Sequence, residues 1–204
     1  MKKPKKIKMK IEHYSDFNCP YSYIGLKRLS DAASELDLKP KWEMKSFELP
    51  LSHEIDYEEV REIAERDNLI INDVKLNSSR NAHRLTKFVQ NKCPEYSQEL
   101  IFKIYEANFE KREDISDIEV LARIASSLGI DEDETRKMLS GRTYNLEVEL
   151  DTQDAVFNGI TAIPHYSLYV DGQRLIVPGA FEKEDFKIAL KDLISGEIRY
   201  KTFL

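Results

Sequence analysis

Hydrophobic and polar residues alternate near both ends of the chain. Alternation over residues 7–12 and 42–46 predicts two strands, and helical spacing of apolar residues over 20–36 predicts a helix between them. A strand, helix, strand order implies a right-handed crossover and a parallel pair of strands. Toward the other end, residues 166–177 predict a hairpin around an Asp-Gly turn, and residues 186–193 predict a closing helix.

The long middle of the chain follows helical spacing instead. Ser116-Asp-Ile-Glu119 has the hydroxyl and carboxylate spacing of a capping box, so a helix is expected to begin there. Asp131 is expected to cap the next helix. The last helix of this block is predicted over 144–157, with Leu146 and Leu150 among its apolar positions.

Neither strand-bearing end has enough elements to form a stable sheet alone. Joining them gives one α/β domain made of residues 1–51 and 158–204, with residues 52–157 as an inserted helical domain. The order of elements is that of a thioredoxin fold. The sequence therefore predicts an α/β, thioredoxin-like fold with a large all-helical insertion.

Composition excludes several classes of function. The formal charge of -6 gives no general attraction to nucleic acid, and no apolar run is long enough for a membrane span. The basic N-terminus lacks the apolar segment of a signal peptide, so a cytoplasmic location is expected. The two cysteines are too few for a disulfide scaffold, and the four histidines lack metal-ligand spacing, so no metal site is expected.

Cys19 is placed where a thiol can become a nucleophile. It lies at the predicted turn from strand to helix, and Pro20 suits the first helical position. Free amide groups and the helix dipole stabilise an anion there, so we expect this thiol to lose its proton more readily than usual. Ser22 occupies the position at which a dithiol motif has its second cysteine.

Pro164 lies directly before the predicted hairpin. A cis-proline facing the cysteine would turn the chain sharply and leave neighbouring backbone groups free to bind a substrate. An ordinary trans proline that opens a strand is the alternative. The combination with a Cys-Pro helix start favours the cis form.

These features resemble those of the DsbA-like thioredoxin-fold family of FrnE type, whose relatives include 2-hydroxychromene-2-carboxylate isomerases and kappa-class glutathione transferases. The resemblance implies a thioredoxin fold with a helical insertion and thiol-disulfide chemistry. It runs from about residue 6 to residue 194 and is carried by residues 16–25, 46–50, 77–85, 117–121, 159–164 and 177–180.

The resemblance also implies roles for particular residues. Cys19 matches the attacking cysteine and Ser22 the resolving position, while Ile163 and Pro164 match the cis-proline loop. Pro20, Tyr21, Asn77 and His83 are implied substrate-binding residues. The FrnE pattern expects Cys-Pro-Trp-Cys, whereas the isomerase and transferase relatives have serine at the first position, so this chain lies between the two groups.

Because serine cannot form a disulfide, another thiol must resolve a mixed disulfide on Cys19. Glutathione or a similar small thiol, a second cysteine of the substrate, or a distant cysteine could do so. Cys93 is a candidate for the last role, although it also suits an ordinary turn between helices. The Ser22 hydroxyl can still donate a hydrogen bond to the Cys19 thiolate.

Other candidate residues have a structural alternative. His83 could line a cleft over Cys19 or satisfy a core hydrogen bond, and His165 could influence Cys19 or face solvent. Tyr21, Tyr23 and Phe17 could form an apolar substrate wall, although Tyr23 and Ile24 could equally belong to the core.

Three functions therefore remain open. The first is a thiol-disulfide oxidoreductase or disulfide isomerase with Cys19 as its nucleophile. The second is a glutathione-dependent isomerase or transferase acting on a small aromatic or electrophilic compound. The third is a thioredoxin domain that only binds a partner. We expect thiol or disulfide substrates, no nucleic-acid or membrane partner, a possible homodimer, and no tightly bound cofactor beyond glutathione or another small thiol as co-substrate.

Overall fold

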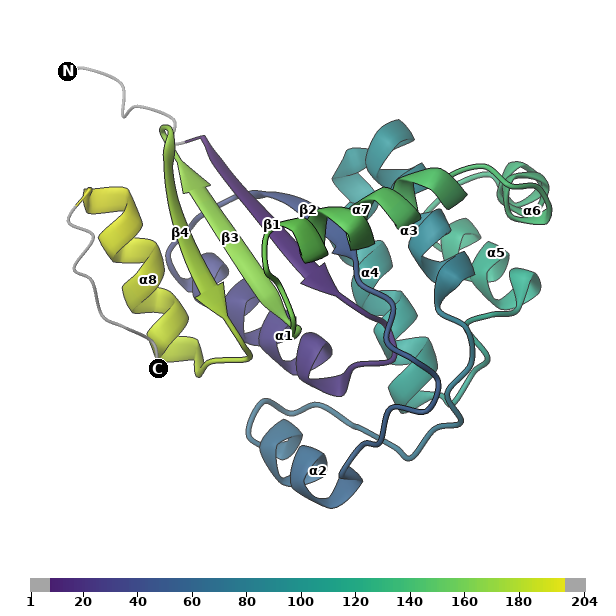
Figure 1. The fold of residues 1–204 in the computed structure, drawn as a ribbon, viewed down its shortest axis with the longest axis horizontal. Coiled ribbons are helices and arrows are strands. Elements are labelled where there is room, and N and C mark those ends of the chain that lie inside the picture. The colour runs from purple at the N-terminus through teal and green to yellow at the C-terminus, as the bar shows by residue number, and fades with distance from the viewer. Residues whose placement is uncertain (1–7, 197–204) are drawn as a thin grey trace.

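A computed structural model describes residues 8–196; the remaining residues of the expected thioredoxin-like domain lie outside this range. Within it, four strands form one mixed sheet in the order β2-β1-β3-β4 (Figure 1). Strand β1 pairs parallel with β2 and antiparallel with β3, which forms an antiparallel hairpin with β4. The strands are β1 (Met9–Ser15), β2 (Lys41–Ser46), β3 (His165–Val170) and β4 (Gln173–Pro178).

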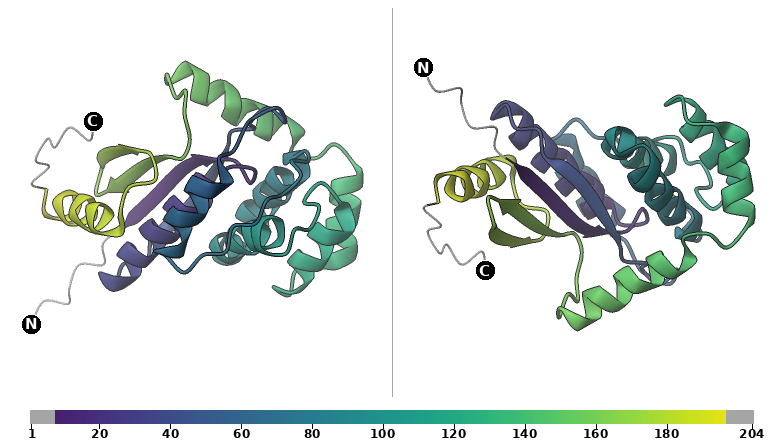
Figure 2. Two further views of the ribbon diagram at one scale, coloured as in Figure 1. Left: turned by 90° about the horizontal axis from the view of Figure 1, so that it is seen from below. Right: turned by 90° about the horizontal axis from the view of Figure 1, so that it is seen from above.

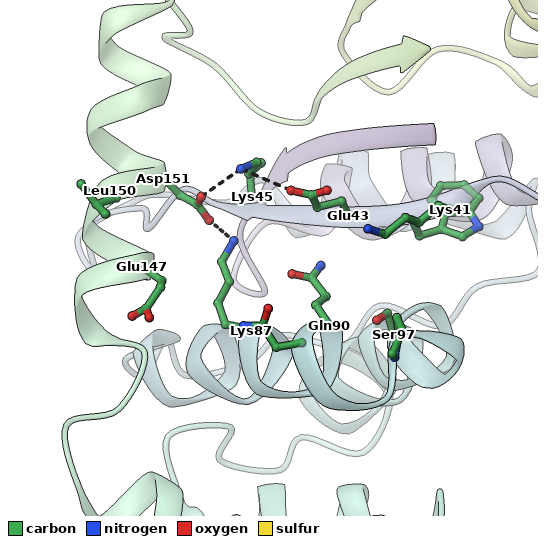
Figure 3. A pocket seen from close by; sticks show the side chains of 12 residues that line it. Lys41, Glu43, Lys45, Lys87, Gln90, Ser97, Glu147, Leu150 and Asp151 are labelled. Carbon is green, nitrogen blue, oxygen red and sulfur yellow. Dashed lines mark ion pairs between the residues drawn. The ribbon is translucent and has the colours of Figure 1, made fainter. Parts of the chain in front are cut away.

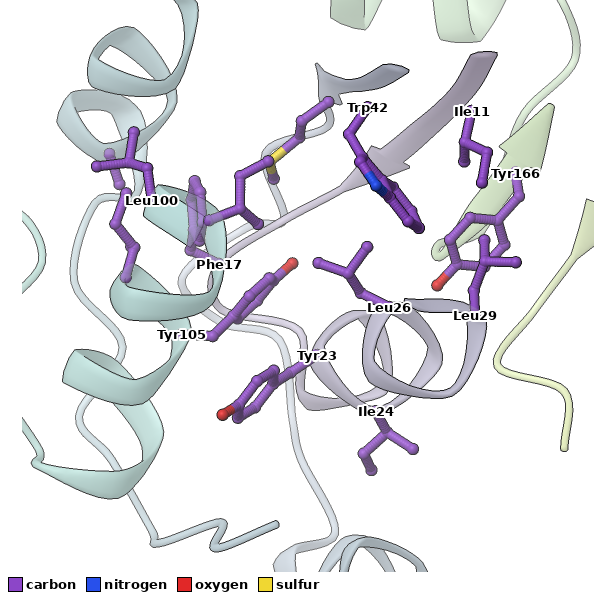
Figure 4. Packing of buried hydrophobic residues seen from close by; sticks show 14 of the residues in the cluster. Ile11, Phe17, Tyr23, Ile24, Leu26, Leu29, Trp42, Leu100, Tyr105 and Tyr166 are labelled. Carbon is purple, nitrogen blue, oxygen red and sulfur yellow. The ribbon is translucent and has the colours of Figure 1, made fainter. Parts of the chain in front are cut away.

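Helices α1 (Pro20–Glu35) and α8 (Lys183–Ser195) pack against each other beside this sheet. The inward residues of β1, such as Ile11, pair in register with Trp42 on β2 and Leu168 on β3, which gives the sheet one apolar face. Figure 4 shows this core continuing through Tyr23 of α1 to Tyr105. The stacked rings of Tyr23 and Tyr105, 5.0 Å apart, connect the sheet side of the molecule to its helical part.

The chain between β2 and β3 is helical, and most of this segment lies beyond β2 in Figures 1 and 2. The chain is thus an α/β thioredoxin fold with a helical insertion, as expected. The helices are α2 (Tyr57–Glu65), α3 (Arg80–Lys92), α4 (Ser97–Tyr105), α5 (Ile118–Ser126), α6 (Glu132–Ser140) and α7 (Asn145–Phe157), with a short 3-10 turn at Pro94–Tyr96 and a π-helical turn at Glu106–Glu110.

Two local predictions within the helical segment are wrong. Asp117, not Ser116, caps α5, because its carboxylate accepts the Glu119 amide hydrogen while the Ser116 hydroxyl donates to Asp114. Leu146 and Leu150 of α7 are 62% and 50% exposed. Helix α7 lies along the edge of the sheet, so only a narrow stripe that includes Val148 is buried.

That edge is closed by charged side chains, which Figure 3 shows between β2, α3 and α7. Buried Asp151 of α7 accepts the Ser46 amide hydrogen at 2.8 Å and forms ion pairs with Lys45 and Lys87. The Lys87 ammonium also donates to the carbonyl of Met44 at 3.1 Å. Since these side chains occupy backbone groups of β2, another strand cannot easily pair with it.

Asp151→Ala should lower the free energy of unfolding by about 3 kcal/mol, because it leaves the buried Lys87 ammonium without its counter-ion. Urea unfolding followed by circular dichroism measures this. Gln153→Ala, on the exposed side of the same helix, is the control and should change stability by less than about 0.5 kcal/mol. Equal effects of the two substitutions would contradict the role given to Asp151.

Candidate active site

Cys19 is the N-cap of α1, and Pro20 is the first residue of that helix, as predicted. The extended backbone of Cys19 leads out of the loop that follows β1, and its carbonyl accepts the Ser22 amide hydrogen at 3.1 Å. Its Sγ atom lies 4.0 Å from the carbonyl oxygen of Ile163. The Ile163–Pro164 peptide bond is cis. The thiol and the proline loop, 144 residues apart in the sequence, therefore meet in the fold.

The expected low pKa of Cys19 is wrong for this structure. The side chain is only 3% exposed, and burial raises the pKa of the thiol to about 11. The Ser22 hydroxyl and amide and the Tyr21 amide lower the pKa, whereas the negative charge of Asp16 raises it further. The helix start does favour the thiolate, but loss of hydration outweighs it.

Ser22 lies one turn into α1 and is fully buried. Its hydroxyl makes no fully formed hydrogen bond among the described residues, and it interacts with the Cys19 sulfur and with the Tyr105 hydroxyl. A serine here can donate a hydrogen bond to a thiolate, but it has no sulfur with which to form a disulfide. The site thus retains a hydrogen-bond donor that can stabilise the Cys19 thiolate, but it lacks the second thiol that would resolve a mixed disulfide.

The helical segment holds the loop before Cys19 in place. The Asp16 carbonyl accepts the Cys19 amide hydrogen and the Tyr105 hydroxyl hydrogen, both at 3.1 Å. The Asn108 side chain donates to the Phe17 carbonyl at 2.9 Å. Because Tyr105 belongs to α4 and Asn108 to the π-helical turn after it, the insertion fixes the position of the thiol.

Asn77 and His83 both contact the loop that carries Cys19. The Asn77 carbonyl accepts a hydrogen bond from the Asn18 side chain at 2.8 Å, so this residue supports the cysteine loop through its backbone. His83 is fully buried, with Nε2 3.2 Å from Asp16 Oδ1. Of the two alternatives for His83, the structure supports the core hydrogen bond.

Tyr21, Ile163 and Pro164 do share a surface, a cavity of about 570 Å³ beside the thiol. Of the proposed apolar wall, only Tyr21 takes part, because Phe17 and Tyr23 are buried in the core. Most of the remaining lining residues carry a carboxylate or a guanidinium group, and the others are small or apolar. The other lining residues are Arg28, Glu59, Glu62, Ile63, Arg66, Gly179, Ala180 and Glu182.

Cys93 lies at the opposite end of α3 from His83, whose ring contacts Asp16 of the cysteine loop. His83 is near the start of α3, whereas Cys93 follows its last residue, so about 15 Å of helix separates them. Both cysteines are free.

His165 begins β3 next to the cis-proline and packs its ring edge-on to Tyr14. Burial lowers the pKa of this imidazole, and the charge of Arg174 lowers it further. Over residues 8–196, no three His, Cys, Asp or Glu side chains are grouped closely enough to hold a metal ion. None of the helices described here has the length and apolar character needed to cross a membrane.

The sequence interpretation missed Asp16, Tyr105 and Asn108 as residues of the site. Asp16 lies three positions before Cys19, and an acidic residue within so short a loop was the available signal. The other two are more than eighty residues away in the sequence. No local pattern connects such distant residues with the cysteine.

Comparison with known proteins agrees with this architecture. A family model described as a DSBA-like thioredoxin domain matches residues 10–191. The uncharacterized protein YwbO of Bacillus subtilis is 24% identical over 204 residues, which cover 89% of this chain and 96% of that protein. A probable DsbA oxidoreductase from Streptomyces coelicolor has a similar structure, with a TM-score of 0.78, 23% identity and coverage of 96% and 93% of the two chains.

Two further solved structures share the fold at lower identity. The cytosolic disulfide reductase DsbM from Pseudomonas aeruginosa superposes with a TM-score of 0.72 and 14% identity over 91% of this chain and 98% of that one. A 2-hydroxychromene-2-carboxylate isomerase superposes with a TM-score of 0.67 and 15% identity over 93% and 96%.

Alkylation of Cys19 should be slow at neutral pH and should rise with a midpoint near pH 11, because burial favours the neutral thiol. Iodoacetamide kinetics in a Cys93→Ser background measure this midpoint. Ser22→Ala should raise it further, whereas Ser34→Ala, on the exposed side of the same helix, should leave it unchanged. A wild-type midpoint below about pH 8 would mean that burial does not control this thiol.

Proposed function

Because the chain belongs to the DSBA-like thioredoxin domain family, we propose that it is a thiol-disulfide oxidoreductase or disulfide isomerase that uses Cys19 as its only nucleophile. The observation that carries the proposal is the meeting of Cys19 Sγ with the Ile163 carbonyl, 4.0 Å apart, at the start of a helix and beside the cis-proline. Membership of the family supports the expectation of an enzyme of this class.

The reaction begins when the Cys19 thiolate attacks one sulfur of a disulfide and expels the other sulfur as a thiolate. Cys19 is then joined to the substrate in a mixed disulfide. An external thiol of the glutathione class, or a second thiol of the substrate, attacks this bond in its thiolate form and releases Cys19. Ser22 takes no part in the exchange of sulfurs. Cys93 follows the last residue of α3 and does not line the cavity, which supports an external resolving thiol.

Because burial disfavours the charged thiolate, neighbouring groups must stabilise it when Cys19 ionises. The Ser22 hydroxyl and the amides of Ser22 and Tyr21 are the groups that stabilise the thiolate. A substrate disulfide that enters the cavity beside Tyr21 and Ile163 would lie against the backbone on which the thiol rests. The backbone amide and carbonyl of Ile163 would hold an extended substrate there, whereas the Pro164 carbonyl already accepts the Gly179 amide hydrogen at 2.8 Å.

A glutathione-dependent isomerase or transferase is the second candidate, and the cavity favours it. Its volume of about 570 Å³ is of the size used by small ligands, and Arg66 and Glu59 offer charges of both signs to a zwitterion. An isomerase of this kind and DsbM in a structure with GSH are both among the similar folds. In this reading glutathione is a co-substrate, and its sulfur would lie near Ser22 and Cys19.

The cytoplasmic location and the homodimer remain predictions. A cytosolic disulfide reductase among the structural neighbours supports the first. A reducing compartment would supply the external thiol that a single-cysteine cycle requires.

Cys19→Ala should abolish reduction of insulin and turnover of a glutathione mixed disulfide, because no other thiol lies at the site. Cys93→Ser is the matched control and should retain at least about half of the wild-type rate, since Cys93 does not line the cavity. Retained exchange in Cys19→Ala would remove the proposal. Conjugation or isomerisation without exchange would favour the second candidate, and a wild-type thiol inert in every assay would favour a binding module.

Ser22→Cys should create a dithiol site and make release of the substrate independent of external thiol. The new side chain would occupy the fully buried position one turn after Cys19, within reach of its sulfur. Single-turnover release of a labelled peptide from the mixed disulfide, followed without added glutathione, measures this. Ser34→Cys, on the exposed side of α1, is the control and should give no release.

A further inference from the structure

The Asp16 carboxylate is a charged group of the cysteine loop, and the helical insertion contacts it through His83. It is fully buried, and three donors surround it: the Leu49 amide at 2.6 Å, the Asn18 amide at 3.4 Å and His83 Nε2 at 3.2 Å. An ionised carboxylate only accepts hydrogen bonds, so all three neighbours suit the charged form. Its negative charge opposes ionisation of Cys19.

His83 is the only one of these three donors that belongs to the inserted helices. It comes from the first turn of α3, and its ring packs on Phe17 with 5.0 Å between centroids. The other ring nitrogen, Nδ1, is buried and has no hydrogen-bond partner among residues 8–196. The contact with Asp16 is therefore the polar interaction that orients this imidazole.

We propose that His83 is a positioning residue that acts on Cys19 through Asp16. Its Nε2–H holds the carboxylate in place and disperses the negative charge that faces the thiolate. The inference deepens the proposed function, on which it rests by taking Cys19 as the reacting group. It gives the helical insertion a chemical role at the site, in place of direct contact between His83 and substrate.

Other titratable groups face the same region, and their charges must be the same in all the variants that are compared. Tyr105 on α4 and Tyr166 on β3 are buried and interact electrostatically with Cys19. His13 on β1 interacts with His83 and is held neutral, because burial lowers its pKa to about 3. Tyr21 on α1 also interacts with Cys19. These groups are neutral at pH 7. A difference in the Cys19 alkylation rate between variants at that pH can therefore be assigned to Asp16 and His83.

A double-mutant cycle tests the coupling. Alkylation of Cys19 is measured against pH in Cys93→Ser protein carrying His83→Leu, Asp16→Asn or both, with His83→Gln as the conservative variant. His83→Leu should slow alkylation at fixed pH about tenfold and move its midpoint upward, because Asp16 then acts undispersed. Asp16→Asn should move the midpoint downward, and adding His83→Leu to it should change the rate less than about twofold.

His83→Gln can still donate to Asp16 and should remain within about threefold of the wild-type rate. Equal effects of His83→Leu with and without Asp16, or equal losses for Leu and Gln, would overturn the proposal and leave His83 as packing. If His83→Leu does not fold, the His83 Nε2–H resonance of the wild type provides the second measurement. It should shift when Cys19 is alkylated and lose that response in Asp16→Asn; an unchanged resonance would overturn the proposal.

Failure of the two proposals can be distinguished, because alkylation reports on the thiol whether or not a disulfide is turned over. Loss of the coupling with intact disulfide exchange removes the role of His83 alone. Intact coupling without exchange or reduction removes the proposed function and leaves the interaction between His83, Asp16 and Cys19.

Discussion

The backbone and side chain of Asp16 make the contacts on which the geometry of the cysteine loop depends. Its carbonyl accepts hydrogen bonds from the Cys19 amide and the Tyr105 hydroxyl. Its carboxylate accepts hydrogen bonds from the Leu49 amide and from His83. Donors from the strand side and from the inserted helices thus converge on one buried residue. A buried carboxylate without such donors would be strongly destabilising, so these segments must pack together for the loop to form.

The same burial explains the state of the thiol. A helix start lowers the free energy of a thiolate by providing amide hydrogens, but only hydration makes that effect sufficient at neutral pH. Cys19 has the amide hydrogens and lacks the water. Its reactivity is therefore controlled by access to the cavity beside Tyr21 and Ile163 as much as by the helix.

The helical insertion stabilises both the cysteine loop and the outer strand β2. At the cysteine loop it supplies Tyr105, Asn108 and His83, and at the outer strand it supplies Lys87 and Asp151. In each place a polar side chain from a helix satisfies a backbone or charged group of the thioredoxin part. These contacts explain why the two parts of the chain pack as a single structure, since separating them would leave buried polar groups unpaired.

By itself, the sequence determined the class of fold, the order of its elements and the position of Cys19 at a helix start. These follow from the spacing of apolar residues and from Pro20, which act over a few neighbouring positions. It also determined that Ser22 cannot close a disulfide, because that depends only on which atom the residue carries. The cap at Asp117 and the exposed Leu146 and Leu150 were missed, since local patterns do not show which competing group or face is used.

Tertiary structure alone decided the properties of the site. Burial of the thiol, the position of Cys93 outside the cavity and the contact between Asp16 and His83 all arise from residues brought together across long stretches of sequence. A pKa depends on how much water and which charges surround the group in three dimensions. For this reason the sequence could place Cys19 at a helix start, whereas only the packed structure showed that burial raises the pKa of its thiol.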